Sequence, residues 1–321
     1  MPTRRTLLAA AAALPFAARA QAWPSRQVTM ICPLAAGSTA DILTRTMADW
    51  LGRKTGQGFV VDNKPAAHGF LAMEALLRAP ADGHTVALIS QGTHVFNRAL
   101  HKTMPYDPMT DFALVMPLAQ VTNALIVPPA SPFKTPADIV AAAKANPGKL
   151  TYSSGGNGTS HHISAALFSQ MTGAEFTHVP YRGAPQGITA VMAGEVDFAF
   201  YNIPTVLTQI RGGLLRGLAV TSTTASPFLP DLKPVAALGV PGYEMVTWMG
   251  SALRAGTPDA IVARLHALFS EALDDPAIKE KLGAQGFEAM ERMSPARFAA
   301  FLAEEEAKWL PVFRAARIGV D

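Results

Sequence analysis

From residue 27 onward, short apolar runs alternate with segments whose apolar residues recur at the spacing of a helix. Residues 27–33 form the first apolar run. In the segment that follows, Leu43, Met47, Trp50 and Leu51 fall on one helical face. Short strands that alternate with amphipathic helices predict an α/β fold in which parallel sheets are covered by helices.

The predicted elements divide into two Rossmann-like lobes, because the chain crosses between two sheets and later returns. Separate strands are predicted at 114–121 and 124–127, after which Pro128 and Pro129 break the pattern. A return crossing is predicted at 248–253, followed by helices. We expect lobe 1 to comprise residues 23–125 plus 248–321 and lobe 2 residues 126–247, with hinges near 125–129 and 245–250.

Two turns each follow a predicted strand and open a predicted helix. The first carries Gly37, Ser38 and Thr39, and the second reads SGGNGTS over residues 154–160. A helix start leaves several N–H groups unpaired at the positive end of the helix dipole, so it binds anions. Both turns are expected at the carboxyl ends of strands, where open α/β sheets bind ligands. Together they predict two lobes that face one anionic ligand.

The candidate ligand-binding residues are those of the two turns and one strand end. Hydroxyl and acidic residues at helix starts are also ordinary caps, so one turn alone would not require a ligand. Asp41 would repel an anion, and we expect it to cap its own helix or hold water. Tyr201 ends an apolar strand, where it either lines the cleft or packs in the core. The full set is Ser38, Thr39, Ala40, Asp41, Ser154, Asn157, Gly158, Thr159 and Tyr201.

Enzyme motifs such as G-x-S-x-G, H-E-x-x-H, C-x-x-C and the phosphate loop are absent from the sequence. We therefore predict no catalytic residue, no metal site and no cofactor. Ser160 with His162 is a nucleophile–base alternative that lacks a matching acid. His161 and His162 point about 100° apart on a helix, so a metal cluster requires the fold to add His178. Arg182 follows another strand end, where it either meets a carboxylate or lies on the surface.

Residues 1–22 have the pattern of a cleaved secretory signal, with two arginines, an apolar stretch and small residues before Ala22. The order TRRTLL also hints at twin-arginine export. The segment contains three of the 27 basic side chains and none of the 24 acidic ones, so the mature charges balance. This balance argues against a nucleic-acid binder. The single Cys32 excludes an internal disulfide, and we expect it to be a small buried hydrophobe.

An ordered series of short motifs spans nearly the whole mature chain. They are PLAAGSTADILTR at 33–45, PADGHT at 80–85, MPYDPMTDF at 104–112, SGGNGTSHH at 154–162, HVPYRG at 178–183, GEVD at 194–197, LAVTS at 218–222 and GTP at 256–258. By these motifs the chain resembles the Bug family, the tripartite tricarboxylate transporter substrate-binding proteins of Gram-negative bacteria. Each motif is short, but their order and spacing together are specific.

The resemblance implies a two-lobed, type II-like periplasmic binding protein fold that closes on a small carboxylate. It implies that the two turns hold one carboxyl group, partly through waters, with Ser38, Thr39, Asn157, Gly158 and Thr159 as contacts. We therefore expect a monomeric periplasmic protein that captures a small carboxylate for membrane transporter subunits. A periplasmic sensor that presents its ligand to a signalling receptor is the alternative, and it would use the same pocket.

Three departures from the family pattern bear on these expectations. Ser38 stands where the family usually has a second glycine. The segment 63–69 reads NKPAAHG, with Ala66 and His68 in glycine positions, so His68 would alter ligand choice if its loop reaches the cleft. Residues 233–237 read KPVAA instead of a proline-threonine-x-x-glutamate stretch, which changes any partner surface there.

Overall fold

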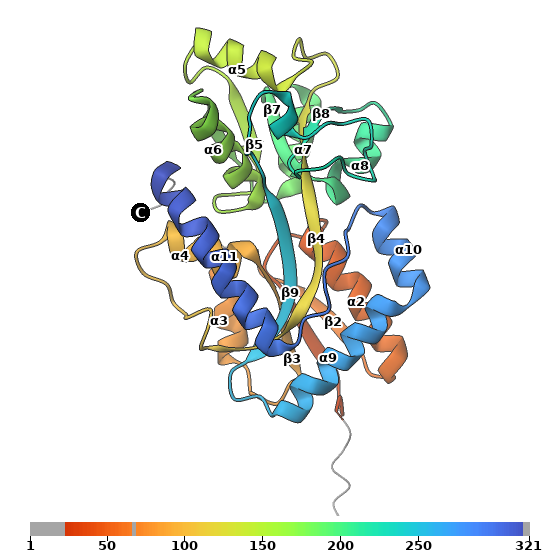
Figure 1. Cartoon of the computed structure of the whole chain (residues 1–321). Coiled ribbons are helices and arrows are strands. Elements are labelled where there is room, and N and C mark those ends of the chain that lie inside the picture. Colours follow the sequence, from red (N-terminus) through yellow and green to blue (C-terminus); the bar gives the residue numbers. More distant parts are fainter. Residues whose placement is uncertain (1–22, 66–68, 317–321) are drawn as a thin grey trace, which may run out of the picture.

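The computed structural model describes residues 23–65 and 69–316. Two halves lie one above the other, joined by the long strands β4 (Phe112–Val127) and β9 (Val246–Arg254) (Figure 1). The strand order is β2-β1-β3-β9-β4-β7-β5-β6, and β8 also pairs with β4. The expected signal segment 1–22 and His68 lie outside the described residues.

The lower half contains the first three strands and the N-terminal end of the described structure, whereas the C-terminal end lies at the level of the upper half (Figure 1). Strand β1 pairs in parallel with β2 and β3, whereas β9 runs antiparallel to β3 and β4. Its elements are β1 (Val28–Cys32), α2 (Thr39–Thr55), β2 (Phe59–Asn63), α3 (Phe70–Arg78), β3 (Thr85–Ser90), η2 (Gly92–Phe96), α4 (Asn97–Leu100), α9 (Asp259–Asp274), α10 (Pro276–Ala284) and α11 (Pro295–Ala316).

In the upper half, β5 lies between β6 and β7 and is parallel to both, while β4 runs antiparallel to β7 and β8. The sheet is therefore mixed in both halves, which corrects the expectation of purely parallel sheets. The elements are α5 (Pro136–Ala145), β5 (Thr151–Ser154), α6 (Ser160–Thr172), β6 (Thr177–Pro180), α7 (Ala184–Ala193), β7 (Phe198–Asn202), α8 (Ile203–Arg211), β8 (Arg216–Val220) and η3 (Val235–Leu238).

Strand β4 is continuous where the sequence predicted two separate strands. Thr122 pairs with Val246 of β9, and the next residue, Asn123, pairs with Asn202 of β7. The polar pair Thr122–Asn123 does not end the strand, because the Thr122 hydroxyl donates to Glu288 and the Asn123 N–H donates to the Thr221 hydroxyl. A single strand therefore belongs to both halves.

Helices pack on both faces of the sheet. In the lower half α2 and α9 bury Leu43, Met47 and Leu265 against one face, whereas α3 and α11 bury Leu76 and Phe298 against the other. The helical face predicted from Leu43, Met47, Trp50 and Leu51 is confirmed, since all four are buried. Cys32 is buried as expected, and burial raises the pKa of its thiol to about 11.

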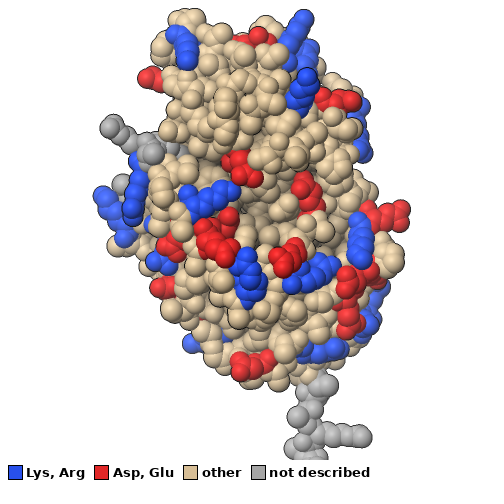
Figure 2. All heavy atoms as spheres, in the orientation of Figure 1, with Lys and Arg blue, Asp and Glu red and all other residues tan. Residues whose placement is uncertain are grey.

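A hollow lies between the halves on the face seen in Figure 2, with acidic and basic side chains around it. Its volume is about 280 Å³, and its lining includes Glu244, Glu305 and Lys308. Gln120 and Trp248 of the two long strands also line it. Their neighbours Val121 and Met249 line a different pocket, on the opposite face of the strands, because side chains alternate along a strand. That opposite face holds the two predicted turns.

Candidate functional site

The first predicted turn connects β1 to α2, and its side chains satisfy part of the helix start. Ser38 is the N-cap, and its Oγ accepts from the Asp41 N–H at 3.3 Å. The Ser38 N–H donates to the carbonyl of Ala35 at 3.1 Å. Of the first four N–H groups of α2, those of Thr39 and Ala40 have no partner among the described residues.

The second turn, between β5 and α6, repeats this arrangement. Thr159 is the N-cap, and its Oγ1 accepts from the His162 N–H at 3.5 Å. The Thr159 N–H donates to the carbonyl of Gly156 at 3.4 Å. The N–H groups of Ser160 and His161 are left without a partner within the described chain.

All four residues with unpaired N–H groups line one small pocket, which we call the inner chamber. Its volume is about 70 Å³, and Thr39, Ala40, Ser160 and His161 lie in its wall. The remaining wall is largely apolar and includes Leu34, Phe96, Val121 and Met249. Two helix N-termini, one from each half, therefore present donors to the same enclosed space, which suits one carboxylate.

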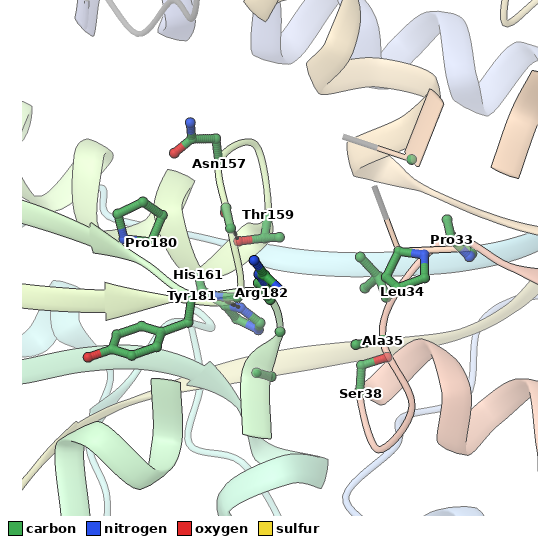
Figure 3. Close-up of a pocket in the computed structure, with 16 residues that line it drawn as sticks. Pro33, Leu34, Ala35, Ser38, Asn157, Thr159, His161, Pro180, Tyr181 and Arg182 are labelled. Atoms are coloured by element: carbon green, nitrogen blue, oxygen red, sulfur yellow. Dashed lines mark hydrogen bonds between the residues drawn. The ribbon is translucent and has the colours of Figure 1, made fainter. Parts of the chain in front are cut away.

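A second pocket, the outer chamber, adjoins the first and has a volume of about 230 Å³. The two chambers share six lining residues: Pro33, Leu34, Gly69, Asn157, Thr159 and His161. Figure 3 shows the outer chamber between the first turn, with Ala35 and Ser38, and the second turn, with Asn157 and Thr159. A ligand that is longer than a carboxyl group can therefore extend from the inner chamber into the outer one.

A buried polar network connects the two turns behind the inner chamber. Asn202 Oδ1 accepts from the Thr39 hydroxyl and from His161 Nε2, each at 3.1 Å. His161 Nδ1 accepts from the Gly155 N–H at 3.2 Å, so Nε2 carries the ring proton. Burial lowers the pKa of His161 to about 4, and the imidazole is therefore neutral near pH 7. The chamber offers uncharged donors.

The two halves touch at the rim of the chambers. A Cβ placed on Gly183 would lie 2.9 Å from the Cβ of Ala35 across the cleft, and one on Gly37 would lie 3.4 Å from Pro185 Cγ. With the bond from Thr39 to Asn202, these contacts close the space between the first turn and the upper half. The structure is a closed form.

Six of the nine candidate residues line the chambers. Ser38 lines the outer chamber, Thr39, Ala40 and Gly158 line the inner one, and Asn157 and Thr159 line both. The hydroxyl protons of Thr39 and Thr159 are already used, because they donate to Asn202 and to the Gly156 carbonyl. Backbone amides therefore outnumber hydroxyls as free donors.

The other three candidates lie outside both chambers and support the turns. The Asp41 carboxylate accepts from the Gly37 N–H, from Arg45 and from Asn63. Burial alone would raise the pKa of Asp41, but these hydrogen bonds outweigh it and keep the pKa below its ordinary value. Asp41 thus closes its own turn.

Ser154 and Tyr201 support the second turn from behind. Ser154 Oγ lies 2.7 Å from His178 Nε2 and accepts from the Gly156 N–H at 3.1 Å. Tyr201 is fully buried, and its hydroxyl donates to Ser153 Oγ at 3.2 Å while its ring packs on His161.

The catalytic and metal alternatives find no support in the described structure. Ser160 Oγ accepts from Asn202 Nδ2 at 3.3 Å. His161 faces the chamber, whereas His162 stacks on His178 with ring centroids 4.4 Å apart. In the described part of the chain no group of three or more His, Cys, Asp or Glu residues could hold a metal ion. Asn202, which joins the turns, was not predicted; its only signal is a polar side chain directly after an apolar strand.

Comparison with known proteins shows which family the chain belongs to. Residues 43–318 match the model of the tripartite tricarboxylate transporter family receptor, TctC. The chain belongs to this receptor family. Protein BugT of Bordetella pertussis is 30% identical over 296 residues, which cover 92% of this chain and 90% of BugT. The resemblance to Bug proteins found in the sequence is thereby confirmed.

Solved structures of TctC relatives have the same fold. Rpa4515 of R. palustris, solved with adipate, has a TM-score of 0.89 and 35% identity over 93% of this chain and 100% of its own. MatC from Rhodopseudomonas palustris, solved with bound malate, has a TM-score of 0.85 and 27% identity over 90% of this chain and 99% of its own. The predicted periplasmic-binding fold is confirmed.

TctC and Bug relatives are receptors and binding proteins, so this chain is a solute-binding protein and not an enzyme. Among the helices of residues 23–65 and 69–316, none is long and apolar enough to cross a membrane.

Proposed function

We propose that this chain is a monomeric periplasmic protein that captures a small organic carboxylate between its halves and delivers it to the membrane subunits of a tripartite transporter. One observation carries the proposal: the unpaired N–H groups of Thr39, Ala40, Ser160 and His161 meet in one chamber. The adipate and malate bound by Rpa4515 and MatC support a carboxylate ligand. The signal-like residues 1–22 support export.

The chamber chemistry suits capture followed by release. A carboxylate in the inner chamber accepts from amides at two helix N-termini, each of which favours negative charge. No Lys or Arg lines the inner chamber among the described residues, and His161 is neutral there. A buried ion pair would hold the anion more strongly, whereas neutral donors allow a transporter to take it.

The protein would act as a clamp, in which two lobes close on the ligand. The lobe boundaries expected from the sequence, 23–125 with 248–321 and 126–247, remain our proposal. The change of strand partners between Thr122 and Asn123 supports a hinge close to the first lobe boundary, between residues 125 and 126. A carboxylate that contacts both turns binds the closed form better than the open one, so it shifts the population towards closure.

A thermal-shift panel tests the proposal. The panel contains mono-, di- and tricarboxylates, acidic amino acids and aromatic acids, with glucose and ribose as neutral controls. A ligand at about 100 times its Kd adds roughly 2.7 kcal/mol to the free energy of unfolding, which raises Tm measurably. We expect at least one carboxylate to do so. A shift with the sugars and with no carboxylate would show that the anion assignment is wrong.

A further inference from the structure

The hollow on the face opposite the chambers, which we call the acidic hollow, has more carboxylates in its wall than cations. Figure 2 shows acidic side chains around it, and Glu244, Glu288 and Glu305 line it. Lys308 is the only Lys or Arg among the described residues of its lining, and its Nζ pairs with Glu244 at 3.2 Å. The hollow therefore holds no cation for Glu288 or for Glu305.

Uncharged donors hold these two carboxylates in place. Glu288 accepts from the Thr122 hydroxyl at 3.1 Å and from Gln120 Nε2 at 3.2 Å. Glu305 Oε2 accepts from Trp248 Nε1 at 3.0 Å. Within residues 23–65 and 69–316, neither carboxylate forms an ion pair with a basic side chain. Both are fixed in the wall of the hollow, but their charge is not neutralised there.

A buried acceptor in the same lining has no partner. Gln91 lines the hollow, is 1% exposed, and donates from Nε2 to Glu305 Oε2 at 2.6 Å. This hydrogen bond fixes the orientation of the amide, and Oε1 is left without a hydrogen bond to any described residue. Buried polar atoms are normally satisfied. An unpaired acceptor next to an uncompensated carboxylate indicates a ligand that has N–H donors and a positive charge.

The size and lining of the hollow indicate a small organic molecule. Its volume of about 280 Å³ is close to the lower end of the range for small-molecule sites, about 300–1,000 Å³. Val246, Met290 and Phe301 provide apolar side chains against which a short carbon chain can pack. The described part of the chain has no group of three or more His, Cys, Asp or Glu residues that could hold a metal ion. The acceptors therefore suit an amine or a guanidine.

We propose that the acidic hollow is a second ligand site, which takes a small organic cation. Its ammonium or guanidinium group contacts Glu288 and Glu305 and donates to Gln91 Oε1. Hydrogen bonds between a cationic N–H and a carboxylate are roughly twice as strong as those between neutral groups, so the cation replaces weak neutralisation by solvent with specific contacts. The site uses neither chamber, and the proposal does not depend on the proposed carboxylate function.

Isothermal titration calorimetry with defined cations tests the proposal. The probes are putrescine, cadaverine, agmatine and methylguanidine, and 1,4-butanediol is the neutral control because it matches putrescine in length. We expect at least one cation to bind with a stoichiometry of one per chain, whereas the diol does not bind. Added sodium chloride should weaken the binding, because the hollow is open to solvent and its charges are screened.

Charge variants assign the binding to the hollow. Glu288→Gln and Glu305→Gln should each weaken the best cation roughly tenfold, since each removes one charged acceptor. Lys308→Gln should strengthen it several-fold, because it removes the competing ammonium and leaves Glu244 unpaired. Glu280→Gln is the matched control: Glu280 is exposed and does not line the hollow, so the affinity should not change.

The lysine variant keeps the test decisive even if a glutamate variant does not fold. Lys308 is exposed, and its replacement removes a surface ion pair whose contribution to stability is small. Circular dichroism checks the fold of every variant.

Two results would overturn the proposal. The first is that none of the four cations binds at millimolar concentration. The second is a cation affinity that is unchanged by Lys308→Gln and by each folded glutamate variant, because the cation would then lie elsewhere. Neither result bears on the carboxylate function, which the thermal-shift panel tests at the chambers.

Discussion

At the scale of single residues, the ligand contacts that the site can make depend on which hydroxyl and amide donors already form hydrogen bonds within the protein. The sequence predicts Thr39 and Thr159 as ligand contacts, but both hydroxyls donate within the protein. The unpaired amides beside them follow from the helix starts, because every helix leaves such groups. Asn202 could not be predicted as the partner of Thr39, since it lies 163 residues away and only the closed fold brings it there.

Ser38 separates the capping role from the ligand role. Asp caps a helix about as well as Ser, but Ser38 is buried beside the Asp41 carboxylate, so Ser38→Asp should also lower the free energy of unfolding, by about 1–3 kcal/mol. Its carboxylate would face the outer chamber and repel an anionic ligand, raising Kd at least about tenfold. Ser38→Ala is the control, with a loss of about 1 kcal/mol in stability and a smaller effect on binding. Urea unfolding and calorimetry measure both; unchanged binding by Ser38→Asp would place the ligand elsewhere.

Buried histidines make the fold sensitive to mild acid. Burial lowers the pKa of His94 to about 3 and the pKa values of His161 and His178 to about 4, from an ordinary 6.5. Between pH 6.5 and pH 5 the unfolded chain therefore binds more protons than the folded one. The free energy of unfolding should fall as pH falls, by up to about 1.4 kcal/mol per pH unit for each histidine.

Urea unfolding between pH 7 and pH 5 checks this dependence. His161→Gln should show a shallower slope, because one of the three groups is gone. Asp41 does not contribute in this window, since its pKa lies below the ordinary 3.8. A slope unchanged by His161→Gln, or a stability that rises on acidification, would contradict the assignment.

At the scale of elements, the sequence predicts most strands and helices because apolar runs and glycine or proline breaks mark them locally. Strand β1, Val28–Cys32, is found within the predicted apolar run 27–33. The continuity of β4 could not be predicted, because partners from β9, β7 and Glu288 satisfy its polar centre. The sequence predicts helices after residue 253 but does not separate α10, which begins at Pro276 directly after α9.

Gly250 allows helix α11 to pack on strand β9. A Cβ there would lie 2.6 Å from Phe298 Cζ and 2.9 Å from the Met116 carbonyl oxygen. Gly250→Ala should therefore lower the free energy of unfolding by about 1–3 kcal/mol through overpacking. Gly52→Ala is the control: in the interior of α2 its Cβ has room, with the nearest atom at 3.5 Å, and the change should stabilise by about 0.5–1 kcal/mol. Equal effects in urea unfolding would contradict this packing.

At the scale of the whole molecule, two lobes and a two-strand crossing follow from the order of elements, whereas the closed arrangement depends on contacts between distant loops. Ala35 meets Gly183, and Thr39 bonds to Asn202, across the cleft. No local pattern in the sequence predicts these contacts across the cleft.

Closure should be visible in solution. We expect small-angle X-ray scattering to give a smaller radius of gyration with a bound carboxylate than without one. Thr39→Val removes the hydroxyl bond to Asn202 at nearly constant volume, so it should shift the population towards the open form and raise Kd several-fold. A radius that is the same with and without a saturating ligand would argue against a clamp.

The central claim is that two helix N-termini, one from each half, hold the same carboxyl group. A crystal structure with the carboxylate that raises Tm most would test it directly. The claim predicts carboxylate oxygens in the inner chamber, within direct or single-water hydrogen-bonding reach of the N–H groups of Thr39 or Ala40 on one side and Ser160 or His161 on the other. A carboxylate bound to only one of the two helices, or outside the chamber, would contradict it.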